Sequence, residues 1–285
     1  MKKIFSTLGL TTIICLSFLL SEKTSIVVKD IDEIMSTIKE YNKEYNEEPI
    51  EAIEENDKII PGIEGKKVNI EKSYTEMKKI GYYNEKNYVY DIVKPKISIE
   101  NKYDKYIIKG NPKKNAISLV FIIYENANIN KIIDIINKEK VDATFFIDSK
   151  WLEKNNEQAK KIIEEGHTIG ILSYNNKYTK EDLITVKNFI KRTGIQKNNY
   201  CLLLTESKEN LEVCSKQKNY TILLNKIVKK NPINEIKKEL KPGNIIALEV
   251  NEEINNELEI VVKYIKSKGL NLENLEKHLA EKKDN

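Results

Sequence analysis

The spacing of apolar residues along this chain changes several times between its two ends. An uninterrupted apolar run occupies residues 4–20, directly after Lys2 and Lys3. From Ile31 to Ile38, apolar residues recur every three or four positions within a charged stretch, which predicts one amphipathic helix that ends near Tyr45. Between residues 88 and 108 apolar and polar positions alternate, and this pattern predicts two or three strands.

Beyond residue 114 the chain alternates between segments typical of strands and segments typical of helices. The continuous apolar run at residues 117–123 is expected of a parallel strand that is buried on both faces. Further strands are predicted at residues 143–147, 167–171, 201–204, 221–224 and 245–250, with helices at residues 130–138, 157–165, 179–193, 211–217, 233–240, 255–268 and 275–280. This order implies right-handed strand–helix–strand units, a parallel sheet and an α/β fold.

A smaller α+β segment is predicted before the main domain. Residues 47–57 are acidic and contain Pro49, so we interpret them as a linker. Ser73 is expected to cap a helix, because Glu76 three residues later completes a capping box, and the helix is expected to stop near Gly81. The predicted division is residues 1–25 (signal or anchor helix), 26–58 (helical stalk and acidic linker), 59–113 (small α+β extension) and 114–285 (main domain).

Composition narrows the class of partner. Charged residues make up 32% of the 285 residues, yet the net charge is only +4, because lysine and glutamate are finely interspersed. A nucleic-acid surface would need clustering of positive charge, so these charges are interpreted as solvated helix faces and no nucleic-acid partner is expected.

The amino-terminal run has the layout of a secretory signal or a membrane anchor. Its 17 residues lie near the lower limit for a helix that spans a bilayer. No small-residue cleavage site follows, since Ser17 and Leu19 enclose the bulky Phe18. We therefore expect an uncleaved anchor at the cell membrane with an extracytoplasmic carboxy-terminal domain, because the two lysines keep the amino terminus inside. Cleavage and secretion is the alternative.

The few cysteines and histidines give little sign of a reactive site. Three cysteines do not make a disulfide framework, and Cys15 lies in the predicted anchor. For Cys201 and Cys214 a bridge is possible, but two buried thiols are preferred. His167 follows a predicted helix stop and is interpreted as a packing or hydrogen-bonding residue, whereas His278, among lysine and glutamate neighbours, is expected at the surface.

Three stretches of the main domain resemble one known family. They are Val-Asp-Ala-Thr-Phe-Phe-Ile at residues 141–147, Gly-His-Thr-Ile-Gly at 166–170, and Lys-Pro-Gly-Asn-Ile-Ile-Ala-Leu-Glu at 241–249. In these motifs the chain resembles the polysaccharide deacetylases with a NodB-homology domain. These are metal-dependent carbohydrate esterases that remove acetyl groups from cell-wall glycans. The resemblance covers residues 115–280 and implies an incomplete, distorted (β/α) barrel.

The resemblance also implies where a site would lie, namely at the carboxyl ends of the barrel strands. A metal-dependent deacetylase needs ligands for a divalent ion, a carboxylate base and an acid for the leaving group. The positions that the resemblance assigns to the base, the metal-binding Asp, the two ligand histidines, the arginine motif and the acid histidine hold, in that order, Ile122, Ile123, Leu172, Asn176, Cys201 and Glu249. Aliphatic side chains offer no lone pair to a cation, so no catalytic residue, metal or other cofactor is predicted.

Other residues near the predicted strand ends are weaker candidates. Asp148 and Glu125 follow strands as site carboxylates would. Glu249 is a candidate carboxylate for a new site, but the sequence offers no partners for it. Aromatic residues near the expected cleft are candidate platforms for sugar rings: Trp151, Tyr174, Tyr178 and Tyr200. Core or surface packing is the simpler interpretation for each of them.

The sequence therefore favours a catalytically inactive polysaccharide-deacetylase-like protein at the outer face of the membrane, which binds cell-wall glycan or an envelope protein. An active polysaccharide or peptidoglycan deacetylase with a non-standard metal site is the alternative, and a purely structural envelope component is a third hypothesis. Intact ligand motifs would favour the active enzyme, and their loss ranks it lower.

Overall fold

The structure is a computed structural model that describes residues 32–124, 127–173, 176–193 and 196–283. The predicted anchor at residues 1–25 lies outside these residues. Within them, no helix combines the length and the apolar character needed to cross a bilayer. The described chain forms two units, one from residues 32–49 and 65–93 and the other from residues 50–64 and 94–283.

The first unit contains two helices and a two-stranded sheet. Helix α2 (Glu33–Tyr41) contacts α3 (Ile70–Ile80), and β3 (Gly65–Val68) pairs antiparallel with β4 (Tyr90–Val93). Short 3₁₀ turns follow α2 (Asn42–Tyr45) and precede β4 (Glu85–Asn87). The buried face of α2, which includes Met35 and Ile38, joins Met77 of α3 in one apolar cluster. The predicted stalk helix thus belongs to the core of the first unit. The small α+β unit is therefore formed by residues 32–49 and 65–93 and not by the predicted residues 59–113.

The start of α3 also differs from the prediction. Asn69, not Ser73, is its N-cap, and its side-chain Oδ1 accepts a hydrogen bond from Lys72 N at 2.9 Å. Ser73 is buried, and its hydroxyl accepts from Val89 N at 2.9 Å, so a long-range partner replaced the local cap. The helix ends at Gly81, as predicted, because its φ of 82° lies in the left-handed region that glycine tolerates.

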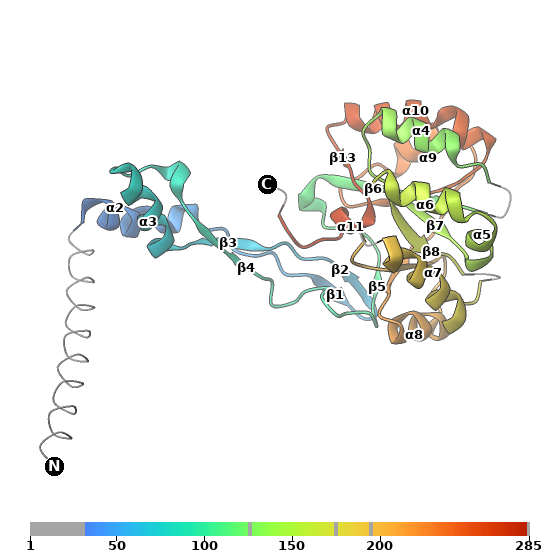
Figure 1. The fold of residues 1–285 in the computed structure, drawn as a ribbon, viewed down its shortest axis with the longest axis horizontal. Coiled ribbons are helices and arrows are strands. Elements are labelled where there is room, and N and C mark those ends of the chain that lie inside the picture. Colours follow the sequence, from blue (N-terminus) through green and yellow to red (C-terminus); the bar gives the residue numbers. More distant parts are fainter. Residues whose placement is uncertain (1–31, 125–126, 174–175, 194–195, 284–285) are drawn as a thin grey trace, which may run out of the picture. The chain divides into compact units, whose positions relative to one another are not determined.

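The second unit is built on a curled sheet (Figure 1). Its strand order is β1-β2-β5-β10-β9-β8-β7-β6-β12-β11, with β13 beside β6. The parallel centre consists of β6 (Ala116–Ile122), β7 (Thr144–Ile147), β8 (Thr168–Ile171), β9 (Tyr200–Leu203), β10 (Tyr220–Leu223) and β12 (Ile245–Glu249). The remaining strands are β1 (Ile53–Glu55), β2 (Lys58–Ile60), β5 (Tyr106–Ile107), β11 (Ile227–Val228) and β13 (Asn271–Leu272), and only β1 runs antiparallel to its neighbour. The predicted α/β half-barrel is confirmed.

Helices cover the outer face of this sheet. They are α4 (Asn130–Lys138), α5 (Ser149–Lys154), α6 (Asn156–Glu164), α7 (Lys180–Thr193), α8 (Lys208–Lys216), α9 (Pro232–Glu239) and α10 (Glu252–Ser267), while α11 (Leu275–His278) follows β13 and a 3₁₀ turn (Pro112–Lys114) precedes β6. Figure 1 shows α4, α9 and α10 grouped together. All seven residues of β6 are buried, because alternate side chains enter an outer cluster with the helices and an inner cluster within the curl.

His278 is buried inside the fold, so its predicted surface position was wrong. Its Nδ1 lies 2.8 Å from the hydroxyl of Ser118 on β6, and that hydroxyl donates to the Glu273 carbonyl. The imidazole nitrogen is therefore the donor to Ser118. Gly110 makes room for the ring, since a Cβ there would lie 2.3 Å from Nε2. Helix α11 contacts β6, and charged sequence neighbours gave no sign of this long-range packing.

The buried imidazole predicts a pH dependence. Burial, with a smaller contribution from Lys114, lowers the pKa of His278 to about 3, whereas an unfolded histidine titrates near 6.5. Below about pH 6.5 the unfolded chain binds a proton at this histidine, whereas the folded chain does not. The free energy of unfolding therefore decreases as the pH falls, by about 2 kcal/mol at about pH 5. Melting curves across this range should show the decline. His278→Gln should flatten it in part, because burial also lowers the pKa of His167; an unchanged slope would contradict the assignment.

Candidate functional site

The carboxyl ends of the parallel strands bring most of the predicted site positions to one edge. Ile122 ends β6, and the register of the sheet places it opposite Glu249 of β12 and Phe146 of β7. Leu172 directly follows β8. Cys201 of β9 pairs with Ile171 of β8, but its side chain belongs to the outer cluster beneath the helices. The sheet therefore assembles Ile122, Leu172 and Glu249 as a barrel mouth would, while Cys201 faces away from it.

Ile122 and Ile123 point to opposite faces of the sheet. Ile122 is fully buried in the inner cluster with Leu172 and Phe146. Ile123 is equally buried but belongs to the outer cluster beneath the helices. Ile122 and Leu172 therefore share one cluster and Ile123 does not, because successive residues of a strand alternate between faces.

The remaining positions carry heteroatoms: the side chains of Glu249 and Cys201 are already engaged, whereas Asn176 is engaged through its backbone carbonyl. Glu249 is half-buried, and its Oε2 lies 2.9 Å from Lys229 Nζ. Cys201 is fully buried and is joined to Cys214 by a disulfide. Asn176 has a left-handed backbone with φ of 58°, and its carbonyl accepts from Asn210 Nδ2 at 3.1 Å.

The divalent metal that the family implies does not fit these residues. Three of the positions hold buried aliphatic side chains, and the thiolate that zinc would prefer is absent at Cys201 because the sulfur is oxidised. Across residues 32–283, apart from the three short gaps in the structure, no group of three or more histidine, cysteine or acidic side chains is close enough together to hold a metal ion. No step of a metal-dependent mechanism can be assigned to this site.

A shallow hollow remains above the buried aliphatic floor. Its volume is about 350 Å³, and its lining includes Tyr124, Leu172, Ser173, Asn176 and Thr205. Tyr124 is 44% exposed. Its partial burial raises the pKa of the phenol, and Glu249 raises it further, so the hydroxyl stays protonated and can donate a hydrogen bond.

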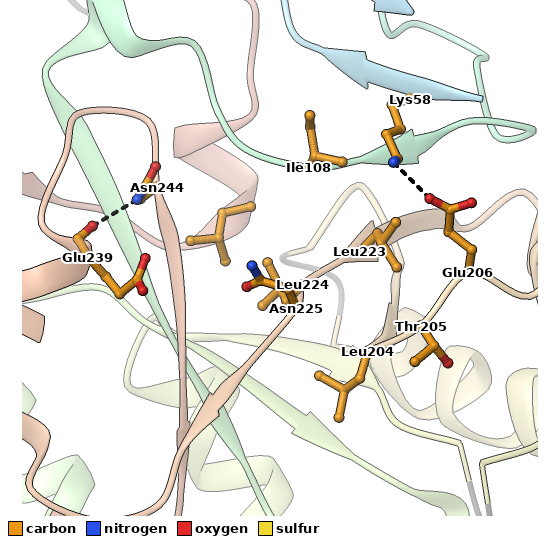
Figure 2. Close-up of a pocket in the computed structure, with 11 residues that line it drawn as sticks. Lys58, Ile108, Leu204, Thr205, Glu206, Leu223, Leu224, Asn225, Glu239 and Asn244 are labelled. Atoms are coloured by element: carbon orange, nitrogen blue, oxygen red, sulfur yellow. Dashed lines mark hydrogen bonds and ion pairs between the residues drawn. The ribbon is translucent and has the colours of Figure 1, made fainter. Parts of the chain in front are cut away.

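A second hollow adjoins the first at Leu204 and Thr205, which line both (Figure 2). It has a volume of about 460 Å³ and receives residues from β2, β10 and β12. Strands β10 and β12 are not hydrogen-bonded neighbours, so this hollow lies where the curled sheet stays open. Lys58 Nζ and Glu206 Oε1 form an ion pair of 2.7 Å at its side, and Leu204 is 41% exposed. The two hollows together form an open groove lined by apolar, hydroxyl and amide groups.

A third hollow, of about 690 Å³, lies on the other side of Tyr124. Its lining is rich in amides and contains Asn128, Asn255 and Asn256 as well as Glu249. Tyr124 thus lines two hollows and presents an aromatic ring between them. The sequence offered one signal for Tyr124, because it directly follows the predicted strand at residues 117–123, but Tyr124 was not predicted as a site residue.

Most of the other candidates support the fold. His167 is buried, and its Nε2 lies 3.1 Å from Asn137 Oδ1, which confirms the predicted packing and hydrogen-bonding role. Asp148 is the N-cap of α5 and accepts from Trp151 N at 2.7 Å. Glu125 and Tyr174 lie outside the described residues.

Three of the four candidate aromatic platforms are buried, which confirms core packing, the simpler interpretation, and excludes stacking on sugar rings for these three. Trp151, Tyr178 and Tyr200 are almost completely inaccessible. The Tyr178 hydroxyl lies 2.7 Å from the Ile171 carbonyl and accepts from Leu202 N at 2.8 Å, so it joins β8 to β9. The Tyr200 hydroxyl donates to Glu276 at 3.4 Å.

The sequence is similar to one family model and to several known proteins. The polysaccharide deacetylase family model matches residues 109–223. The uncharacterized protein YlxY of Bacillus subtilis is 38% identical over 159 residues, which are 55% of this chain and 50% of that protein. The peptidoglycan-N-acetylmuramic acid deacetylase PdaA of the same organism is 34% identical over 80 residues, or 28% of this chain and 30% of PdaA. The chain thus spans at most half the length of these relatives.

Comparison with solved structures gives the same architecture. BA3943 of Bacillus anthracis, a CE4 family pseudoenzyme, superposes with a TM-score of 0.66 at 23% identity over 89% of this chain and 97% of its own. PdaA of Bacillus subtilis, a family 4 carbohydrate esterase, gives a TM-score of 0.53 at 22% identity over 64% of this chain and 86% of its own. At these identities the likeness shows a shared fold.

Proposed function

Because this chain carries a polysaccharide deacetylase domain of the carbohydrate esterase type and is a degenerate member of that family, we propose that it is catalytically inactive and binds cell-wall glycan. The observation that carries the proposal is the environment of Ile122. Its side chain is fully buried in an apolar cluster at the strand end where the resemblance implies a catalytic carboxylate.

The chemistry of the site supports the loss of catalysis. A deacetylase must activate water with a carboxylate base and hold a metal, and it must protonate the departing amine. Ile122 and Leu172 supply neither proton transfer nor a lone pair. Glu249 is paired with Lys229, so its negative charge is already balanced. Restoring the chemistry would require several changes at once.

The groove supports retention of glycan binding. Sugar rings present apolar C–H faces and hydroxyl groups, so sites for them combine aromatic faces with amide and hydroxyl partners. Tyr124 offers an exposed aromatic face between two hollows, and Ser173 and Thr205 offer hydroxyl groups. An envelope protein that presents the same surface chemistry is the alternative occupant.

The proposed place of action is the outer face of the cell membrane. Lys2, Lys3 and the apolar run at residues 4–20 support an anchored amino terminus with an extracytoplasmic domain. A glycan of the cell wall is within reach of a domain in that position.

Activity, metal content and glycan binding test this proposal together. The full chain, incubated with Zn²⁺ or Co²⁺ and N-acetylated cell-wall oligosaccharides, is expected to release no acetate and to retain no stoichiometric metal in elemental analysis, because its site residues supply no ligand set. The same chain should sediment with purified, insoluble cell-wall glycan. Tyr124→Ala should weaken that binding about fivefold or more, since a stacked ring contributes about 1 kcal/mol or more.

Tyr82→Ala is the matched control, because Tyr82 is 59% exposed but belongs to the first unit. Its binding should equal that of the unchanged chain. Acetate release that disappears on Glu249→Gln would establish the alternative, an active deacetylase with a non-standard site. Equal binding by Tyr124→Ala and Tyr82→Ala would remove the groove from the proposal.

A further inference from the structure

A cavity at the other end of the barrel is bordered by basic and amide side chains. It has a volume of about 520 Å³ and lies between α7 and the segments that lead into β9 and β10. Asn199 immediately precedes β9 and Gln217 follows α8, so the cavity adjoins the amino ends of these strands, whereas the groove adjoins their carboxyl ends. Its polar lining consists of Lys187, Asn188, Lys191, Gln196, Lys197, Asn199 and Gln217, and we call it the lysine pocket.

The lysine pocket has no acidic residue in its lining. Elsewhere on the described surface lysines are commonly paired, as Lys263 is with Glu259 and Lys216 with Glu212. Within the part of the chain that the structure describes, Lys187, Lys191 and Lys197 have no carboxylate oxygen within 4.0 Å. Three positive charges therefore border one cavity without a close ion-pair partner.

Two further charges bear on this field. Lys187 is half-buried, and its Nζ donates to the Gln217 carbonyl. Burial and the neighbouring Lys218 lower the pKa of Lys187. An anion bound in the cavity would raise this pKa again, because it favours the charged form of the lysine. Lys197 acts electrostatically on Glu276, but that carboxylate lies outside the lining and accepts from Asn198 N at 3.1 Å and Nδ2 at 3.0 Å.

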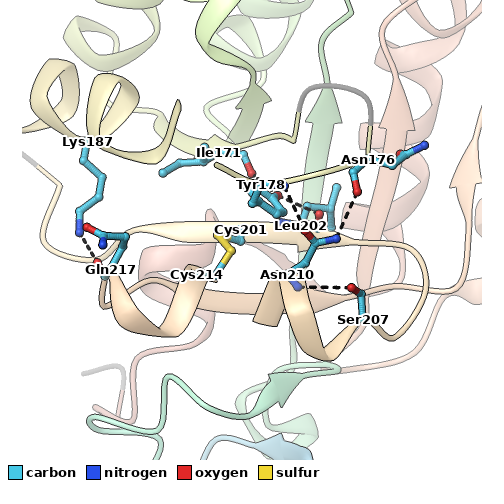
Figure 3. The surroundings of a disulfide bond; sticks show 10 residues. All are labelled: Ile171, Asn176, Tyr178, Lys187, Cys201, Leu202, Ser207, Asn210, Cys214 and Gln217. Atoms are coloured by element: carbon cyan, nitrogen blue, oxygen red, sulfur yellow. Dashed lines mark hydrogen bonds between the residues drawn. A yellow bond between two sulfur atoms is a disulfide. The ribbon is translucent and has the colours of Figure 1, made fainter. Parts of the chain in front are cut away.

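The walls of the lysine pocket are fixed to the barrel. The Gln196 side chain accepts from Ile169 N and donates to Ile169 O, both at 2.8 Å. Figure 3 shows the disulfide between Cys201 of β9 and Cys214 of α8, which lies beside the contact of Lys187 with Gln217. Walls held in place lose little conformational entropy when a ligand binds.

We propose that the lysine pocket binds the phosphate groups of a soluble phosphodiester-linked polymer other than a nucleic acid. Ammonium groups of Lys187, Lys191 and Lys197 supply charge-assisted hydrogen bonds to phosphate oxygens, and the amides of Asn188 and Asn199 supply further donors. The cavity is larger than a single phosphate needs, which favours a chain of them. A lipid surface is disfavoured, because among the described residues of the lining Ile184, 36% exposed, is the only exposed large apolar side chain. The proposal is independent of whether the groove binds glycan.

Fluorescence anisotropy of the full chain with a labelled glycerol-phosphate oligomer tests the proposal. Binding is expected, with inorganic phosphate and tripolyphosphate as competitors. The combined variant Lys187→Gln, Lys191→Gln and Lys197→Gln should weaken binding at least about tenfold, since hydrogen bonds to charged groups are among the stronger ones. Lys191→Gln and Lys197→Gln alone, both at exposed positions that need not perturb the fold, should each weaken it about threefold.

The matched control removes the same charge from three exposed lysines outside the pocket, by Lys113→Gln, Lys230→Gln and Lys241→Gln. It should change binding less than about twofold. Equal losses in both triple variants would reduce the effect to net charge and overturn the proposal. Absence of binding to the oligomer, or binding only to vesicles that contain phosphatidylglycerol, would overturn it as well.

Discussion

Ile122→Asp is expected to unfold the second unit or to lower its melting temperature by more than about 10 °C. The side chain at this position is fully buried in the inner apolar cluster, which also contains Phe146, Leu172 and Leu202. Burial of an unpaired carboxylate costs several kcal/mol, which is a large part of the total stability of a domain. Ile122→Ala should cost about 2–5 kcal/mol, because it leaves a cavity.

Leu204→Asp is the matched control for this experiment. Leu204 lies at the same end of the barrel and lines the groove, but it is exposed, so its carboxylate would remain in water. Thermal melts followed by circular dichroism should leave this variant within about 3 °C of the unchanged protein. If Ile122→Asp melts in that range too, water reaches the inner face of the strand end. A catalytic or metal-binding role there would then become credible, and the inactive proposal would fail.

Ile123→Asp should be destabilising for a different reason. Ile123 belongs to the outer cluster beneath the helices, so its replacement places a charge between sheet and helices and not near the groove. The double variant Ile122→Asp, Ile123→Asp is therefore expected to be at least as unstable as either single variant, because it places a charge in both clusters. A double variant that melts above either single variant would contradict this expectation.

The sequence predicted the parts of the fold that depend on local pattern. The apolar run of β6 and the alternation of strands with helices gave the parallel sheet, and its strand-end aliphatic residues gave the buried floor of the site. The motifs at residues 166–170 and 241–249 carried the family resemblance. The family model, which matches residues 109–223, confirms the resemblance, and the likeness to BA3943 shows a shared fold.

Features set by long-range packing were not predicted. The charged neighbours of His278 suggested solvent, but contact of α11 with β6 buries the ring against Ser118. Tyr178 looked like a residue of the cleft mouth, yet its hydroxyl joins two strands. Tyr124 was not predicted, because a single aromatic residue after a strand forms no recognisable sequence motif. Its position between two hollows depends on residues that are distant in the sequence.

The disulfide is the clearest case of this kind. A spacing of 13 residues with an intervening helix start favoured two thiols, but α8 turns back onto β10 and brings Cys214 to a Cα–Cα distance of 6.6 Å from Cys201 (Figure 3). The preference for buried thiols was therefore wrong, although both sulfurs are buried. A bridge of this type persists in oxidising compartments, which agrees with the proposed extracytoplasmic position.

Removing the disulfide should destabilise the second unit by about 3 kcal/mol and lower its melting temperature by about 6–12 °C. Cys201→Ala with Cys214→Ala tests this, since alanine leaves no buried polar group. Before that comparison, the unchanged chain is unfolded with iodoacetamide and no reductant. Mass spectrometry should then find Cys15 alkylated and both bridge cysteines unmodified. Alkylation of Cys201 and Cys214 would show free thiols.

The same variant connects the disulfide to the lysine pocket. Cys214 lies near the end of α8, and Gln217 directly follows that helix. Loss of the disulfide should therefore loosen Gln217, whose carbonyl accepts a hydrogen bond from Lys187 Nζ. Binding of the glycerol-phosphate oligomer should therefore weaken about twofold to threefold at a temperature where the variant is still folded, since a looser wall loses more entropy on binding. Unchanged binding in a folded variant would show that the pocket is held by Gln196 and α7 alone, and that the disulfide contributes only to stability.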